Sequence, residues 1–164
     1  MISEQQAENL LTRPESELRL LLANSLSAIQ AEPSLGKTES VFDEGFQGAL
    51  ERGGRETPSN LMSNIADTII QSSIDFTYQL ICSSDDEMKN TRTQVLDAIN
   101  VKNATVVVLI SQYLIGVGFS HAVAAVIAAI VVQYLSKIVK DGSKPLCEHF
   151  KTYTSYAEPD GQAT

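Results

Sequence analysis

The residues best suited to chemistry stand together near the end of the chain, at Cys147, Glu148 and His149. A thiolate and an imidazole are both zinc ligands, and a cysteine paired with a histidine can also act as an activated nucleophile. Residues two apart do not share a helix face, however, and no other cluster supplies the remaining ligands of a tetrahedral site. The spacing therefore argues against zinc, and a nucleophile pair would need a loop that brings the two side chains together.

Two further segments match known motifs only in part. Residues 31–38, Ala-Glu-Pro-Ser-Leu-Gly-Lys-Thr, fit a loosened phosphate-loop pattern, but that loop follows a strand, whereas here a helix precedes it and Pro33 intervenes. Residues 116–121, Gly-Val-Gly-Phe-Ser-His, lack the last glycine of a dinucleotide fingerprint and the glycine that ends a nucleophile elbow. His121 has no carboxylate or thiol beside it in the sequence to complete a metal site. We therefore predict no catalytic residue, no cofactor and no metal.

The cysteine content and the N-terminus predict a compartment. The chain has two cysteines, Cys82 and Cys147, which are too few and too far apart in the sequence for a disulfide framework. We expect two thiols in a reducing environment. The first six residues have no basic start and no apolar run, so no secretory signal is expected. Together these features predict a cytoplasmic protein.

The charge distribution argues against nucleic acid. The chain carries 20 acids and 12 bases, for a net charge of −8. Its bases are spread along the sequence and do not gather into one strongly positive face, which binding to a phosphate backbone requires. We therefore expect no nucleic-acid partner.

Three amphipathic helices are predicted outside the most apolar part of the chain. The first begins near Thr12-Arg13-Pro14-Glu15, which offers a cap, a first-turn proline and a capping-box glutamate. The second begins after Thr57-Pro58 and has a broad apolar surface, and the third begins at Ser84-Asp85-Asp86-Glu87. The first helix carries one apolar stripe, formed by Leu18, Leu21, Leu22, Leu26 and Ile29, which ends before Pro33.

The longest apolar stretch determines the predicted architecture. From Asn103 to Ser136 the chain has no Lys, Arg, Asp or Glu. Gly116, Gly118 and Ser120 interrupt this stretch near its middle and predict a turn. The pattern therefore indicates a helical hairpin over about residues 104–136.

The hairpin could be buried in protein or inserted in a bilayer, and its periodicity does not separate these alternatives. Each arm of roughly 16 residues would span about 24 Å, compared with about 30 Å for the core of a bilayer. Ser111 and Gln112 lie in the middle of the first arm, where polar groups are unfavourable in lipid. These features favour burial, although the lysines that follow the hairpin would also suit the cytoplasmic face of a membrane.

The segment 33–59 is rich in glycine, proline and charge, which predicts a mobile loop. Within it Phe42, Phe46 and Leu50 are spaced four apart and would align on one side of a short helix that docks in a groove. The alternative is a single local turn, which the two intervening glycines favour. Arg52 and Arg55 flank two glycines and predict a protease-accessible tip.

Together these patterns predict an all-α fold, a compact bundle of about five helices around the apolar hairpin. Residues 1–151 form a single helical domain in this interpretation, and residues 152–164 form a disordered tail. The predicted function is that of a non-enzymatic soluble adaptor or regulatory module whose partner is another protein or a second copy. One alternative is a membrane-active protein whose hairpin inserts after the 33–59 loop is cut or displaced. A second alternative is an enzyme of unrecognised type.

Overall fold

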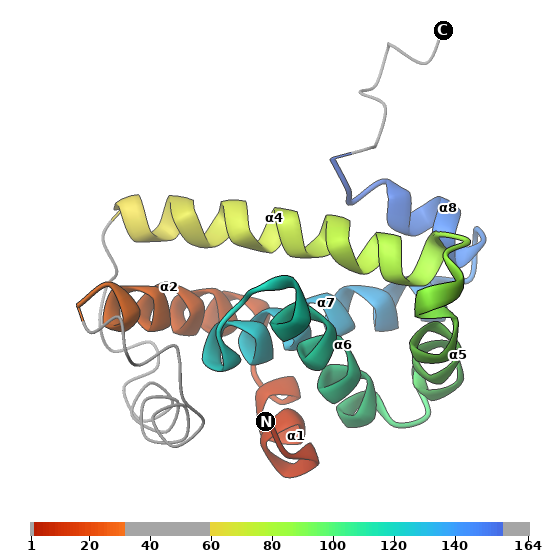
Figure 1. Cartoon of the computed structure of the whole chain (residues 1–164), viewed down its shortest axis with the longest axis horizontal. Coiled ribbons are helices and arrows are strands. Elements are labelled where there is room, and N and C mark those ends of the chain that lie inside the picture. Colours follow the sequence, from red (N-terminus) through yellow and green to blue (C-terminus); the bar gives the residue numbers. More distant parts are fainter. Residues whose placement is uncertain (1, 32–59, 156–164) are drawn as a thin grey trace, which may run out of the picture.

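The computed structural model describes residues 2–31 and 60–155 of the chain, and in this part it contains only helices and their connections (Figure 1). The predicted all-α fold is confirmed. The described elements are α1 (Glu4–Leu11), α2 (Glu15–Ala31), α4 (Asn60–Cys82), a short 3-10 turn (Asp86–Met88), α5 (Lys89–Ala98), α6 (Asn103–Val117), α7 (His121–Asp141) and α8 (Leu146–Lys151).

The predicted hairpin is α6 and α7, and α7 is the centre of the fold. Every residue from Val123 to Val132 is at most 3% exposed. Helices α1, α2, α4, α6 and α8 all contact α7, and Figure 1 shows α2 and α4 running side by side along one flank of the hairpin. Because α7 is apolar on every side in this segment, it can leave water only when helices cover it all round.

Local signals fix both ends of the hairpin turn. Gly118 ends α6 with a φ of 126°, a conformation that L side chains rarely adopt. The Ser120 hydroxyl accepts a hydrogen bond from the Val123 amide and so caps α7, which ends at Gly142 in the left-handed region. Gly116 lies inside α6 and not in the connection, so the turn is shorter than the three predicted positions imply.

The N-terminal part contains a helix that the sequence analysis did not predict. Ser3 and Gln6 form a reciprocal capping box at the start of α1, and Ala7 and Leu10 are buried. Thr12 is the C-cap of α1, so the prediction that it caps the next helix is wrong, although α2 does begin at Glu15. The capping pattern around Pro14 was ambiguous because a threonine can end one helix just before another begins.

The third predicted helix begins later than expected. Asp85, and not Ser84, accepts a hydrogen bond from the Glu87 amide, and this cap opens the 3-10 turn rather than the α-helix. Helix α5 then starts at Lys89. Arg92 secures the connection by donating to the backbone oxygens of Leu80 and Asp85.

The expectation of two free thiols is wrong, because Cys82 and Cys147 form a disulfide. Cys82 is the last residue of α4, and α8 packs against that end of α4, so the two Cα atoms are 5.7 Å apart despite 65 residues between them in the sequence. Phe150 of α8 is completely buried beside Tyr78 of α4, with ring centroids 5.9 Å apart. The disulfide also removes one of the two arguments for a cytoplasmic location.

Packing continues beyond the predicted domain boundary at residue 151. Tyr153 stacks on Tyr134 of α7 with ring centroids 5.6 Å apart, and its backbone oxygen accepts from the Gln71 amide at 3.0 Å. Asp75 of α4 accepts from the backbone amide of Ser155 at 2.8 Å. The start of the predicted tail is therefore part of the fold, and residues 156–164 lie outside the described part.

Replacing both cysteines with serine should lower the free energy of unfolding by about 4 kcal/mol, because a 65-residue loop is no longer closed in the unfolded chain. The measurement is urea unfolding of Cys82→Ser/Cys147→Ser beside the wild type, each with and without reductant. Reductant should lower the wild-type midpoint to that of the double variant and leave the variant unchanged. Equal midpoints for the oxidised wild type and the variant would contradict a stabilising crosslink.

Candidate functional site

The C-terminal residues that the sequence suggested as metal ligands or as a nucleophile pair are engaged in other contacts. Cys147 is in the disulfide, so it is neither a thiolate nucleophile nor a zinc ligand. The Nδ1 of His149 lies 3.6 Å from the Asp141 carboxylate, and its ring stacks on Tyr153. Across residues 2–31 and 60–155 no group of three or more His, Cys, Asp and Glu side chains is arranged to hold a metal ion. Cys147 and His149 therefore hold α8 in place.

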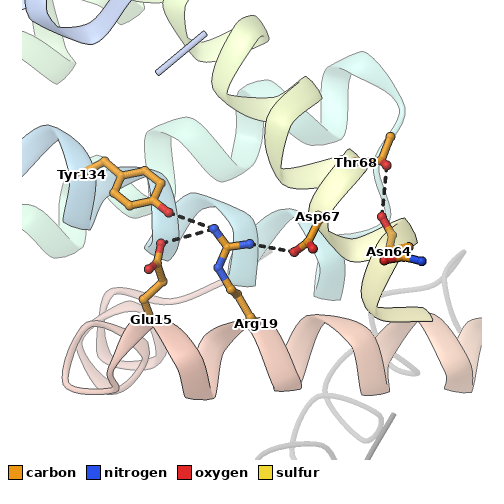
Figure 2. A network of polar contacts seen from close by, with 6 residues as sticks. All are labelled: Glu15, Arg19, Asn64, Asp67, Thr68 and Tyr134. Carbon is orange, nitrogen blue, oxygen red and sulfur yellow. Dashed lines mark hydrogen bonds and ion pairs between the residues drawn. The ribbon is translucent and has the colours of Figure 1, made fainter. Parts of the chain in front are cut away.

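A polar network centred on Arg19 joins three helices (Figure 2). The Arg19 guanidinium on α2 donates to Asp67 of α4 at 2.8 Å and to the Tyr134 hydroxyl of α7 at 3.0 Å. Glu15, one turn earlier on α2, lies 3.4 Å from the same guanidinium. Each charged member of this network faces an opposite charge, an arrangement that positions the three helices relative to one another.

A second ion pair ties α1 to the start of α6. Lys102 Nζ lies 2.8 Å from a Glu4 carboxylate oxygen, and the Thr105 hydroxyl donates to the other oxygen at 3.1 Å. The hydrogen bonds from Lys102 and Thr105 hold the pKa of Glu4 below its ordinary value, and the same pair raises the pKa of Lys102. Both residues keep their charges at neutral pH, which is the property of a structural pair and not of an acid-base catalyst.

The hairpin turn presents apolar side chains to solvent. Phe119 follows the Gly118 turn and meets Phe76 of α4 edge to face, with ring centroids 6.3 Å apart. Phe76 is 36% exposed and Val117, the last residue of α6, is 40% exposed. We call Phe76, Val117 and Phe119 the hairpin-tip surface. It differs from the scattered apolar residues of an ordinary surface in that its members come from two elements and include a ring pair.

The sequence analysis predicted a broad apolar surface for the helix that follows Thr57-Pro58, and it did not separate the exposed Phe76 from the buried positions of that helix. The buried positions of α4 recur at helical spacing and include two hydroxyl residues, Ser73 and Thr77, whose side chains donate to the backbone oxygens of Ile69 and Ser73. Phe76 lies off that line. A stricter helical projection that allowed small hydroxyl residues on the buried face would have indicated this.

Comparison with known proteins identified no relative of this chain. No protein-family model, curated protein or solved structure matches the chain. What the hairpin-tip surface can do chemically follows from its side chains, which offer apolar contact area and an aromatic pair. They bring no nucleophile and no ionisable group.

Helix α7, the buried arm of the hairpin, also has the length and composition of a membrane-spanning helix. Among the described helices α7 alone is long and apolar enough to cross a membrane by length and composition, and 67% of its most apolar 18-residue window is buried in the fold. In α6, Ser111 is 1% exposed and its hydroxyl has no hydrogen-bond partner among the described residues. An apolar environment therefore surrounds the middle of α7 and the buried face of α6.

The remaining predicted sites lie outside the described residues. These are the proposed docking side chains Phe42, Phe46 and Leu50 and the proposed protease-accessible pair Arg52 and Arg55. They stay predictions.

Replacing Arg19 with glutamine should lower the free energy of unfolding by about 1 kcal/mol, since the lost contacts are partly exposed and screened by water. Chemical denaturation measures the change, and Lys89→Gln, which removes an exposed charge from α5, is the matched control. The Asp67→Asn variant should lose less than Arg19→Gln, because the arginine also binds Tyr134. An Arg19→Gln protein as stable as the control would show that the network does not hold α2 against its neighbours.

Proposed function

We propose that the chain is a non-enzymatic soluble interaction module that associates through its hairpin-tip surface. The observation that carries this proposal is that one part of the apolar hairpin is buried and another part is exposed. Its second arm is enclosed as the core, while Val117 at its turn is exposed and the partly buried Phe119 packs against the exposed ring of Phe76. An apolar surface that is rigidly held at a turn and lies next to an aromatic ring has the character of an association hot spot.

A second copy of the chain is the partner that this surface fits best. In a two-fold symmetric contact the same surface meets itself, so a charged surface would repel its own copy. The chain has a net charge of −8, but it has no charged residue between Asn103 and Ser136. The hairpin tip is therefore a part of this acidic protein where two copies can approach with little repulsion from the hairpin itself.

Sedimentation velocity over a dilution series tests the association. The wild-type sedimentation coefficient should rise with concentration, and Phe76→Ser/Val117→Ser should raise the dissociation constant by about tenfold or more, the effect of losing apolar anchors. Leu96→Ser/Val139→Ser is the matched control, because both residues are exposed apolar side chains away from the tip. This control should associate like the wild type.

Two results would contradict association through the tip. One is a wild-type protein that stays monomeric across the series. The other is an equal weakening in the control pair, which would indicate non-specific contact between exposed apolar side chains.

A second candidate function is insertion of the hairpin into a membrane, which the length and composition of α7 favour. Insertion would require α7 to leave the helices that enclose it. The energy for that step would come from apolar contact with lipid, which replaces the contacts with α2 and α4. The predicted trigger, cleavage or displacement of the 33–59 segment, lies outside the described residues.

The Val126→Lys variant distinguishes a soluble interaction module from a membrane-inserted hairpin. Val126 is completely buried, so Val126→Lys places an unpaired charge in the core and should abolish cooperative unfolding, whereas Val139→Lys on the exposed side of the same helix should fold normally. Circular dichroism with urea follows both variants.

Fractionation with an alkaline wash should release the wild type from membranes. A soluble, cooperatively folded Val126→Lys protein would contradict the core role of α7, and wild-type retention in washed membranes would favour insertion.

A further inference from the structure

A polar strip interrupts the apolar surface of α7 near its C-terminal end. Gln133 and Lys137 are four residues apart, as are Ser136 and Lys140, so the four side chains lie on one side of the helix. These four side chains, with Leu11, Asn103 and Val132, line an open cavity of about 240 Å³. The cavity therefore lies where the end of α1, the start of α6 and the last turns of α7 meet.

The charge of this cavity is opposite to that of the whole chain. Its lining contains two lysines and no carboxylate, in a protein with a net charge of −8. The neighbouring Lys102 is neutralised by Glu4 at 2.8 Å. Lys137 and Lys140 are both exposed, and within the described ranges neither forms an ion pair. Their ammonium groups are therefore available to an anion from solution.

The polar side chains of the lining are oriented by neighbouring backbone. The Asn103 side-chain oxygen accepts from the Asn100 amide at 2.8 Å, which leaves the Asn103 side-chain nitrogen as a donor. Gln133 donates to the backbone oxygen of Arg13 at 2.8 Å. The Ser136 hydroxyl donates to Asn100, which holds the strip against the connection before α6.

The start of α6 adds to the positive character of the cavity. Asn103 is the first residue of this helix, and the preceding residue, Lys102, makes no side-chain cap hydrogen bond. The amides of Thr105 and Val106 donate to the Lys102 backbone oxygen, and the helix dipole adds a partial positive charge at that end, where the Thr105 hydroxyl already binds Glu4. The cavity itself is therefore lined by two ammonium groups and the fixed side-chain donor of Asn103.

We propose that this cavity binds the phosphate group of a small phosphate ester. Two lysines match the charge of a phosphate better than that of a single carboxylate, and lysine binds phosphate as a point charge. The volume of about 240 Å³ is below the range typical of pockets for drug-sized ligands, which suits a ligand the size of a headgroup. Leu11 and Val132 supply an apolar wall for the carbon atoms next to the phosphate. This binding is independent of the hairpin-tip surface.

The phosphate ester can come from solution or from a lipid headgroup, and two assays distinguish these sources. Glycerol phosphate and inorganic phosphate are titrated into the isotopically labelled full-length protein, and the backbone amide signals of Asn103 and Ser136 are followed at constant ionic strength. In parallel, vesicles of phosphatidylglycerol or of phosphatidylcholine are tested for co-flotation with the protein. We expect saturable shifts of both signals with a soluble phosphate, or flotation with the anionic vesicles only. Either result supports the site and identifies its source.

Variants that replace a lysine with uncharged glutamine test whether binding takes place in this cavity. Lys137→Gln/Lys140→Gln should raise the dissociation constant by about tenfold or more, because two charge-assisted hydrogen bonds are lost. Lys89→Gln/Lys151→Gln removes the same charge from α5 and α8 and should change it less than about twofold. Lys140→Glu alone, whose unfolding midpoint is checked first, provides a second variant and should abolish binding. Absence of both saturable shifts and flotation, or an equal loss in the control, would overturn the proposal.

Discussion

The burial of α7 is the interaction on which the rest of the structure depends. Its residues from Val123 to Val132 are buried, and none of them is charged. Each valine or isoleucine taken from water contributes about 1.5 to 3 kcal/mol, so the set dominates the stability of the core. A helix that is apolar on all sides needs cover on all sides, which explains why α6 and α2 pack most extensively on it while α1, α4 and α8 close the remainder.

Polar and covalent contacts determine how the covering helices sit on this core. Apolar burial is non-directional, and it would tolerate many rotations of an enclosing helix. The Arg19 network fixes α2 relative to α4 and α7, and the Cys82 to Cys147 disulfide fixes α8 at the end of α4. The Arg19 contacts lie at the edge of the core, where water screens them and each contributes little individually, whereas the disulfide contributes more because it closes a long loop. Their role is to select one arrangement among several that bury similar area.

The two proposed sites use opposite ends of the same buried helix. The hairpin-tip surface lies at the start of α7, and the cavity lined by Lys137 and Lys140 lies near its end, roughly 24 Å away along the helix axis. Both ends depart from the apolar pattern of the middle, one through a turn and the other through a polar strip. A ligand in the cavity would therefore contact α7 directly, and a partner at the tip would contact the connection that leads into α7.

Much of the fold could be predicted from the sequence, because the signals act over a few residues. The absence of charge between Asn103 and Ser136 and the turn at Gly118 determined a helical hairpin, and helical periodicity determined the amphipathic helices that cover it. The tertiary structure alone decided that Cys82 meets Cys147, that Phe76 faces solvent, and that the strip around Lys137 lines a cavity. These facts depend on which helices become neighbours, across 65 residues in the case of the disulfide, and composition and spacing do not specify such distant contacts.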